Sequence, residues 1–283
     1  MMNRKVIMSC LLAAFCATQA LAADMTAEQI VEKNISARGG AAAWHKIQSI
    51  SMMGKLDAGR ERVDGGNVVK GTSPKSHADK KAELRKVAMH MGEEPSAKII
   101  RLPFQMDMKR PLKTRIEVPF NGQTAVQVYD GTQGWKLRPY LGRHEVESFT
   151  PQEAKIAAQQ QELDGPLLDH VAKGTKVSLA GMEQVSGRNA YKLKLTLKNG
   201  DVRNLWIDAK TFLDLKIDGE PRKLDGKPRQ VATYFHDYRT VNGVKIPYEL
   251  ETTVESVRGS DKINIERVEI NPKLEETRFV KPS

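Results

Sequence analysis

The side chains that could transfer protons or ligate metals are few and widely spaced in this 283-residue chain. None of its six histidines lies three or four residues from another, the spacing that brings two ligands onto one helix face. His144-Glu145 and His236-Asp237 are neighbouring pairs, but neighbouring residues on a strand point to opposite faces. The sequence contains no Gly-x-Ser-x-Gly elbow, His-Glu-x-x-His motif, phosphate loop or Gly-x-Gly-x-x-Gly pattern. We therefore expect a protein without catalysis, metal or cofactor.

Methionine is the remaining residue type with ligand chemistry. Met89-His90-Met91 and Met106-Asp107-Met108 each place two thioethers two residues apart, which on a strand means one face. An exported protein could use such soft ligands for copper. Methionine also fills irregular apolar space in protein cores, and we favour this second interpretation.

The first 22 residues have the pattern of a secretory signal peptide. Arg4 and Lys5 precede an apolar stretch, and Ala20-Leu21-Ala22 matches the small-residue cleavage pattern. We predict an exported protein that is soluble after cleavage. Both cysteines, Cys10 and Cys16, lie in this segment. The mature chain would then have no disulfide, reactive thiol, thiolate zinc site or iron–sulfur cluster.

The chain carries 45 Lys+Arg against 35 Asp+Glu, a formal net charge of +10 that falls to +8 without Arg4 and Lys5. The excess is spread thinly, and an exported protein without a dense basic helix is not expected to bind nucleic acid. Two readings stay open: a basic face near anionic lipid headgroups, or surface lysines that maintain solubility.

Three short segments have helical patterns. Thr26 can cap a helix that ends at Gly39-Gly40, with Gln29 as its capping-box partner. A short turn over 41–47 follows. Thr150-Pro151-Gln152-Glu153 combines an N-cap, a proline at the first position and a glutamate at the third. We expect this helix to run to about Leu163.

The rest of the chain alternates with period two and is punctuated by Asn-Gly and Asp-Gly turns, as at 121–122, 130–131 and 199–200. The pattern predicts about ten or eleven antiparallel strands that are apolar on one face and charged on the other. So many strands curl, and their apolar face needs a cover. We therefore predict a mainly β (α+β) fold: a curved, incompletely closed antiparallel barrel with a helical lid over an apolar cavity.

Residues 57–98 interrupt this order. They hold 9 Lys+Arg and 7 Asp+Glu, with Gly65-Gly66 and Ser73-Pro74, and include a weak helical pattern over 79–91. We interpret the segment as a charged, mobile insertion. The predicted organisation is a signal peptide over 1–22 and one domain over 23–283 that contains this insertion.

Several short motifs occur in an order that resembles the outer-membrane lipoprotein-sorting proteins, the LolA-like family. The shared features are an Arg-Pro early in a strand and an Asp-Gly followed by an aromatic strand. The helix end and the tail also look like those of larger members. The residues concerned are Lys109-Arg110-Pro111, Arg115, Asp130-Gly131, Trp135, Ala37-Arg38-Gly39-Gly40, Glu269 to Leu274, and Phe279.

The resemblance implies an incomplete barrel with a helical lid and a role in carrying lipoprotein acyl chains across the periplasm. Family members hand their cargo to an outer-membrane acceptor, so an inner-membrane donor and an outer-membrane acceptor would be partners. By motif match, Arg110 is the arginine that ties the lid closed and takes part in release. The family's aromatic pair after Arg-Pro is absent, because Thr114 and Ile116 stand there.

We consider three hypotheses for the function. The first is a non-catalytic periplasmic carrier, or chaperone, for acyl chains of lipoproteins or lipids. The second is an envelope sensor on the same fold that recognises lipoproteins and binds a membrane-protein partner. The third, an enzyme or metal protein, has the least support. For the ligand site we predict, with Arg110, an apolar wall formed by Met106, Met108, Val126, Val128, Trp135, Leu137, Leu193, Leu195, Leu205 and Ile207.

Overall fold

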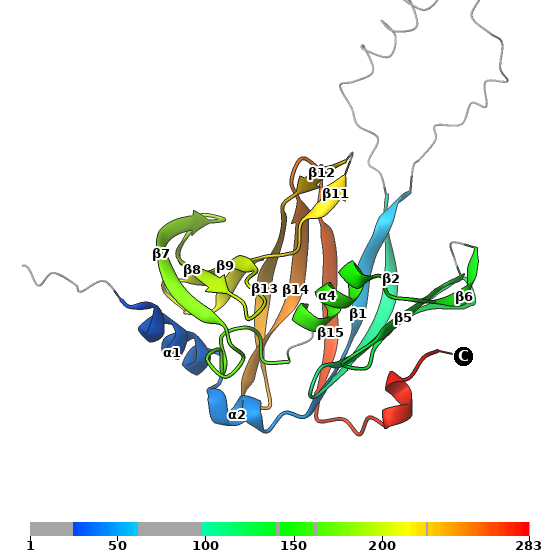
Figure 1. Ribbon diagram of the computed structural model, residues 1–283, viewed down its shortest axis with the longest axis horizontal. Coiled ribbons are helices and arrows are strands. Elements are labelled where there is room, and N and C mark those ends of the chain that lie inside the picture. Colours follow the sequence, from blue (N-terminus) through cyan, green and yellow to red (C-terminus); the bar gives the residue numbers. More distant parts are fainter. Residues whose placement is uncertain (1–24, 62–97, 140–141, 161–162, 225, 283) are drawn as a thin grey trace, which may run out of the picture.

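The computed structural model describes residues 25–61, 98–139, 142–160, 163–224 and 226–282 (Figure 1). The α-helices are α1 (Ala27–Ala37), α2 (Ala41–His45) and α4 (Pro151–Gln160), and a 3₁₀ helix, η2, spans Glu276–Phe279. The strands are β1 (Ser49–Glu61), β2 (Lys98–Lys109), β3 (Lys113–Phe120), β4 (Gln123–Tyr129), β5 (Gly134–Arg138), β6 (Arg143–Ser148), β7 (Lys176–Val185), β8 (Arg188–Thr196), β9 (Val202–Asp208), β10 (Asp214–Asp218), β11 (Arg222–Leu224), β12 (Lys227–Arg229), β13 (Val231–Val241), β14 (Val244–Val254) and β15 (Asp261–Ile270).

Thirteen strands form one antiparallel sheet in the order β6-β5-β4-β3-β2-β1-β15-β14-β13-β10-β9-β8-β7, and β11 pairs with β12 in a separate hairpin. The end strands β6 and β7 do not pair with each other, so the sheet curls without closing (Figure 1). This confirms the predicted fold class. None of the helices in the described part of the chain is long and apolar enough to cross a membrane.

The predicted count of strands was too low, and the missed strands have a common property. Beyond the small β11–β12 hairpin, the pattern missed β6 and β7, which are the two edges of the main sheet. Edge strands face solvent along one side and carry polar residues that discourage further pairing. Their apolar alternation is therefore weak, as the mostly exposed residues of β6 and β7 show.

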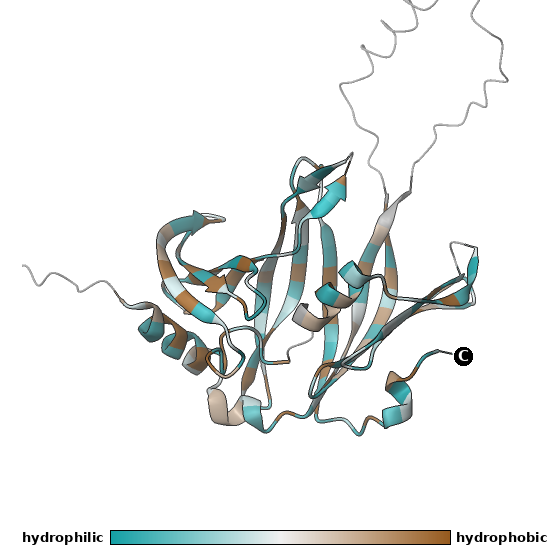
Figure 2. Cartoon of the chain, in the orientation of Figure 1, coloured by the Kyte–Doolittle hydropathy of each residue, from teal (hydrophilic) through white to brown (hydrophobic). Residues whose placement is uncertain are grey.

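The register of the sheet defines two faces. Met106 pairs with Ile116, which pairs with Gln127, which pairs with Lys136, so these side chains share one face. We call this the inner face, because α1, α2 and α4 all lie over it (Figure 1). The outer face carries the intervening residues. The hydropathy of the strands alternates accordingly (Figure 2).

Helix α1 covers the inner face at β7–β9. Thr26 accepts a hydrogen bond from the Gln29 amide, and the Gln29 side chain accepts one from the Thr26 amide, so the predicted capping box is present. Ile30 and Val31 are buried against Leu193 and Leu205. Burial of this apolar stripe holds the helix on the sheet.

The C-terminal segment covers the outer face of β2–β5. Phe279 in η2 is 1% exposed and packs with Leu274 against residues of β4 and β5. Arg278 binds the carboxylates of Asp107 and Glu117. The C-terminal segment therefore buries apolar residues of β4 and β5 on the outer face.

Some expectations fall on residues outside those described. The predicted signal peptide and most of the predicted insertion, with its helical pattern over 79–91, belong to these. The two ends of the insertion are described: β1 continues to Glu61 and β2 begins at Lys98, with Arg60 paired to Ile99.

Candidate functional site

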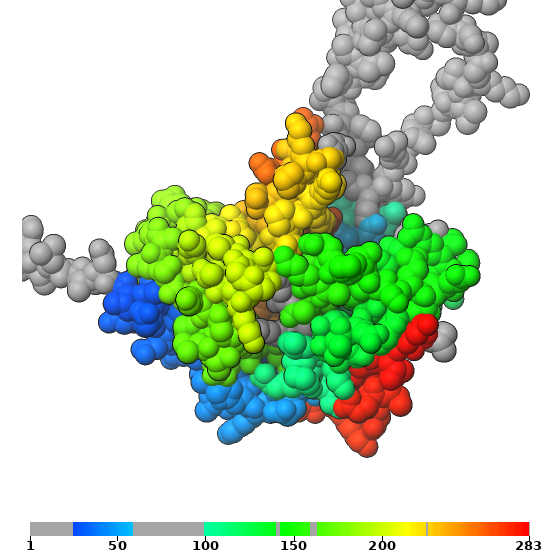
Figure 3. All heavy atoms as spheres, viewed as in Figure 1, coloured from blue at the N-terminus to red at the C-terminus, as the bar shows by residue number. Residues whose placement is uncertain are grey.

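A small pocket lies between α4 and the inner face of β3 and β4. Its volume is about 150 Å³. The space-filling view shows α4 and neighbouring segments covering this side of the sheet (Figure 3). The pocket is lined by Thr114, Ile116, Gln127, Val128, Tyr129, Phe149, Glu153, Ile156 and Ala157. Ligand pockets usually measure about 300–1,000 Å³, so this space must grow before it can hold a long acyl chain.

The N-terminus of α4 is fixed by a capping box and an ion pair. The Thr150 hydroxyl accepts a hydrogen bond from the Glu153 amide, while the Glu153 carboxylate accepts bonds from the Thr150 amide and hydroxyl. The same carboxylate binds Lys136 of β5, with Nζ at 2.5 and 2.6 Å from its two oxygens. The side chain of Lys136 is only 8% exposed.

A second polar cluster lies beyond the C-terminus of α4. The carboxylate of Asp164, 3% exposed, binds Nη2 of Arg110 at 2.7 Å and Nζ of Lys173 at 2.9 Å. Arg110 also donates from Nε to the carbonyl of Ile47 at 2.8 Å and from Nη2 to the carbonyl of Trp44 at 3.2 Å. Arg110 thus joins three parts of the chain: the end of β2, the region of α2 and the segment after α4.

Both anchoring carboxylates are held in the charged form. Burial alone raises the pKa of the Asp164 carboxyl, but hydrogen bonds from Lys173 and Arg110 lower the pKa below its ordinary value. For Glu153, burial again raises the pKa, and hydrogen bonds from Lys136 and Thr150 more than offset it. The ion pairs are therefore intact at neutral pH.

An apolar surface extends from the pocket along the inner face. Several of its side chains are half-buried rather than fully packed, although they adjoin the core formed around Ile50, Phe104 and Ile246. They are Met52, Leu56, Met106, Val118, Leu250 and Ile263. This surface and the α4 pocket together form the candidate site.

The structure divides the wall predicted from sequence into three groups. Met106 and Met108 lie on the inner face, in or against the core that contains Trp44 of α2. Leu193, Leu195, Leu205 and Ile207 also lie on the inner face, but they are at most 1% exposed and pack against α1. The third group, Val126, Val128, Trp135 and Leu137, packs against Phe279 on the outer face.

Placing the third group in the same wall as the methionines therefore needs correction. Val128 pairs with Arg115 and Trp135, and Arg115 pairs with Asp107, so this row of residues lies opposite the row that contains Met106. Alternation identifies which residues share a face, but not which face is internal. Here the C-terminal segment buries the outer face as well. The candidate site therefore leaves out Val126, Trp135 and Leu137, and Val128 belongs to it only as part of the pocket lining.

Sequence reasoning missed Lys136, Glu153 and Asp164 as parts of the site. The pattern identified Glu153 only as part of a helix start, and Asp164 directly follows the predicted end of that helix at about Leu163. A charge that pairs with a residue 17 or 54 positions away leaves no local pattern. A signal that could have drawn attention to Lys136 is a charged residue between two apolar neighbours in a short strand.

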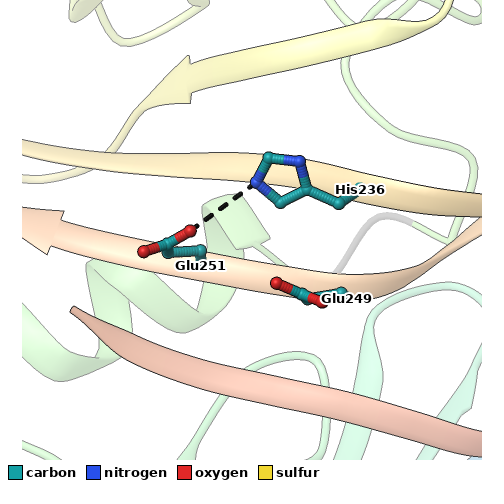
Figure 4. Close-up of side chains that lie close together, drawn as sticks. All are labelled: His236, Glu249 and Glu251. Atoms are coloured by element: carbon teal, nitrogen blue, oxygen red, sulfur yellow. Dashed lines mark ion pairs between the residues drawn. The ribbon is translucent and has the colours of Figure 1, made fainter. Parts of the chain in front are cut away.

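The outer face carries a second cluster of potential ligands. His236, Glu249 and Glu251 offer ligand atoms that lie within 4.8 Å of one another (Figure 4). Lys262 already fills this site with an ammonium, because its Nζ lies 2.8 Å from Glu249 and 3.6 Å from Glu251. Ser260 also donates to Glu251. We interpret the group as an ion-pair network.

A wider depression of about 400 Å³ also lies on the outer face, at β1–β4. Exposed residues such as Pro103, Pro119 and Thr124 line it, beside Glu117 and Glu266. Carboxylates and solvent exposure make it a poor site for an acyl chain. It is therefore separate from the candidate site.

Comparison with solved structures identifies the architecture. A LolA superfamily protein from Nitrosomonas europaea superposes with a TM-score of 0.54 and 12% identity, covering 91% of this chain and 98% of that chain. The fold is LolA-like. A DUF1329 family protein from Desulfovibrio piger superposes on this LolA-like chain with the same TM-score and 13% identity, covering 90% and 97% of the two chains. No protein-family model and no curated protein sequence matches.

Proposed function

We propose that the protein is a non-catalytic periplasmic carrier that binds acyl chains of lipoproteins or lipids on the inner face of the sheet. The observation that carries this proposal is the position of α4. The helix lies beside Ile116 on the inner face, an ion pair between Glu153 and Lys136 holds its first turn, and the Asp164 cluster lies beyond its last residue. A helix held by polar bonds can leave without first breaking a large apolar interface.

The energetics of acyl-chain binding support a lid. Burial of one methylene is worth about 0.8 kcal/mol, so one long acyl chain provides on the order of 10 kcal/mol of gross driving force. The closed pocket of about 150 Å³ has no room for such a chain. Movement of α4 would enlarge the pocket toward Met52, Leu56 and Leu250, and its cost would offset part of the binding free energy.

Arg110 is the residue that we propose controls this movement. Its guanidinium donates to two carbonyls near α2 and to the Asp164 carboxylate. Release of Asp164 would free the segment that follows α4. In this proposal the chain is exported by the predicted signal over 1–22, receives cargo from an inner-membrane donor and transfers it to an outer-membrane acceptor.

Native mass spectrometry of protein isolated from the periplasm tests the proposal. We expect lipid or lipidated peptide bound to the wild type or to an Arg110→Leu variant. More bound mass in the variant would support a role of Arg110 in release. Arg267→Leu is the control, because Arg267 is 67% exposed and pairs in register with Met53 on the outer face, opposite to α4.

Absence of bound mass in both proteins, before and after incubation with lipid vesicles, would contradict the carrier proposal. Retention of a membrane-protein partner in a pull-down would then favour the sensor. Bound mass in the wild type with no change in the Arg110 variant would leave the carrier in place and remove Arg110 from its mechanism.

A further inference from the structure

Lys136 is an unusual residue for the inner face of a lipid-binding sheet. Its side chain is 8% exposed, and its register partner Gln127 lines the pocket under α4. A buried ammonium is costly unless a charged partner accompanies it. The role of the Lys136 charge therefore depends on the group that serves as its counter-ion.

Glu153, the partner of Lys136, lies on α4, the helix that we propose moves. Both oxygens of Glu153, in the first turn of α4, bind the ammonium of Lys136. Glu147 of β6 is 4.0 Å away and already binds Arg138 at 2.7 Å and Arg143 at 3.5 Å. Departure of α4 would therefore remove the close counter-ion of Lys136, while Lys136 itself would stay on β5.

We propose that Lys136 exchanges Glu153 for an anionic group of the ligand when α4 opens. This inference rests on the proposed function and specifies its ligand class: an amphiphile with a phosphate or carboxylate at the root of its acyl chains. The incoming anion restores the charge balance that the departure of Glu153 disturbs. The acyl chains then extend from the pocket along the half-buried apolar surface that includes Met106.

The polar lining of the pocket agrees with such a headgroup. Thr114, Gln127 and Tyr129 belong to the same pocket wall as Glu153, and the Tyr129 hydroxyl donates to the carbonyl of Gly131 at 3.1 Å. An anion bound there would meet both an ammonium and polar groups. A ligand that consisted of hydrocarbon alone would leave Lys136 without a counter-ion.

The test is competition between lipids in one membrane. The full mature protein is incubated with vesicles of equimolar phosphatidylglycerol and phosphatidylcholine with identical acyl chains, and native mass spectrometry measures the ratio of the two bound lipids. Attraction of the basic protein to the vesicle surface is the same for both lipids, so the ratio reports the binding site. We expect phosphatidylglycerol to be enriched about tenfold, the value of one charge-assisted hydrogen bond.

Two variants separate this role from a purely structural one. Glu153→Gln and Lys136→Met both break the ion pair that holds α4. We expect more bound lipid in both variants. The phosphatidylglycerol ratio should be kept or raised in Glu153→Gln, and should fall to near one in Lys136→Met. Lys192→Met is the matched control. It also removes an ammonium that pairs with a glutamate, but Lys192 of β8 and Glu183 of β7 lie on the outer face, away from the pocket.

An unchanged lipid ratio in Lys136→Met would overturn the inference and leave the carrier proposal standing. A reduced ratio in Glu153→Gln would also overturn it. Absence of both lipids from all the proteins would overturn the inference and the carrier proposal together. If Lys136→Met does not fold, Lys136→Gln is measured in its place, with the same expected loss of selectivity.

Discussion

Helices α1 and α4 cover the same face of one sheet by different means. Helix α1 buries Ile30 and Val31 against fully packed leucines. Of residues 151–158 of α4, only Ala157 is buried, and the helix is held by Lys136 at one end and by the Asp164 cluster beyond the other.

The two helices illustrate how one sheet can carry both a fixed helical cover and a movable one. The free energy lost when an apolar interface opens is proportional to the apolar area exposed to water. Detachment of α1 would therefore cost a large free energy. Ion pairs can be exchanged for bonds to water or to a ligand, at a net cost of about 1.5–3 kcal/mol for each charged hydrogen bond. We therefore expect α4 to open while α1 stays in place.

The largest expected effect is a difference in the free energy of unfolding that is lost when an apolar side chain of α1 or of α4 is truncated. Ile30→Ala should lower the free energy of unfolding by about 3 kcal/mol, because the side chain is 0% exposed and leaves a cavity. Ile156→Ala in α4 should lower it by about 1 kcal/mol or less, because Ile156 is only half-buried. Urea unfolding followed by circular dichroism measures both. Equal losses would contradict the distinction between the helices.

Acid should open α4 before it affects α1. The pKa values of Asp164 and Glu153 are lowered from ordinary values of 3.8 and 4.5 in the closed state. Their contribution is therefore fully present above those ordinary values and is lost as the pH falls through the lowered ones. At about pH 3, we expect local opening of α4 to increase about tenfold relative to α1.

Amide hydrogen exchange measures this change. The exchange rates of α4 (residues 151–160) are corrected for the pH dependence of intrinsic exchange and divided by those of α1 (residues 27–37). Asp164→Asn should abolish much of the pH dependence. A constant ratio of protection between the two helices from neutral pH down to about pH 3 would argue against an electrostatic latch.

The smallest expected effect compares the two helix caps. Thr26→Ala and Thr150→Ala each remove a hydroxyl that accepts a hydrogen bond from the backbone amide of the third helical residue. The distance between the hydroxyl oxygen and the amide nitrogen is 3.2 Å in both helices. Each should cost its helix about 1 kcal/mol. In α1 this cost should appear in global unfolding by urea. In α4 it should appear as roughly fivefold faster local hydrogen exchange with little change in global stability. Serine at either position should restore the wild-type value.

The success of sequence reasoning differed between elements for a physical reason. The capping boxes at Thr26 and Thr150 involve residues three apart, and both are present. Central strands such as β8 and β9 show their burial as alternation along the chain. The edges β6 and β7 do not, because a strand with one free side needs polar residues for solubility rather than apolar ones for packing.

The features that short segments of the chain encode are therefore local: the helix starts, the turns, most strands and the sharing of a face by alternate residues. The tertiary structure decided which face is internal, as the position of Val126 and Val128 under Phe279 illustrates. It also decided which charges meet, because Arg110 and Asp164 lie 54 residues apart, and Lys136 meets Glu153 only after α4 folds back over β5. Such contacts depend on register and on chain reversal over long distances, and no short segment encodes either one.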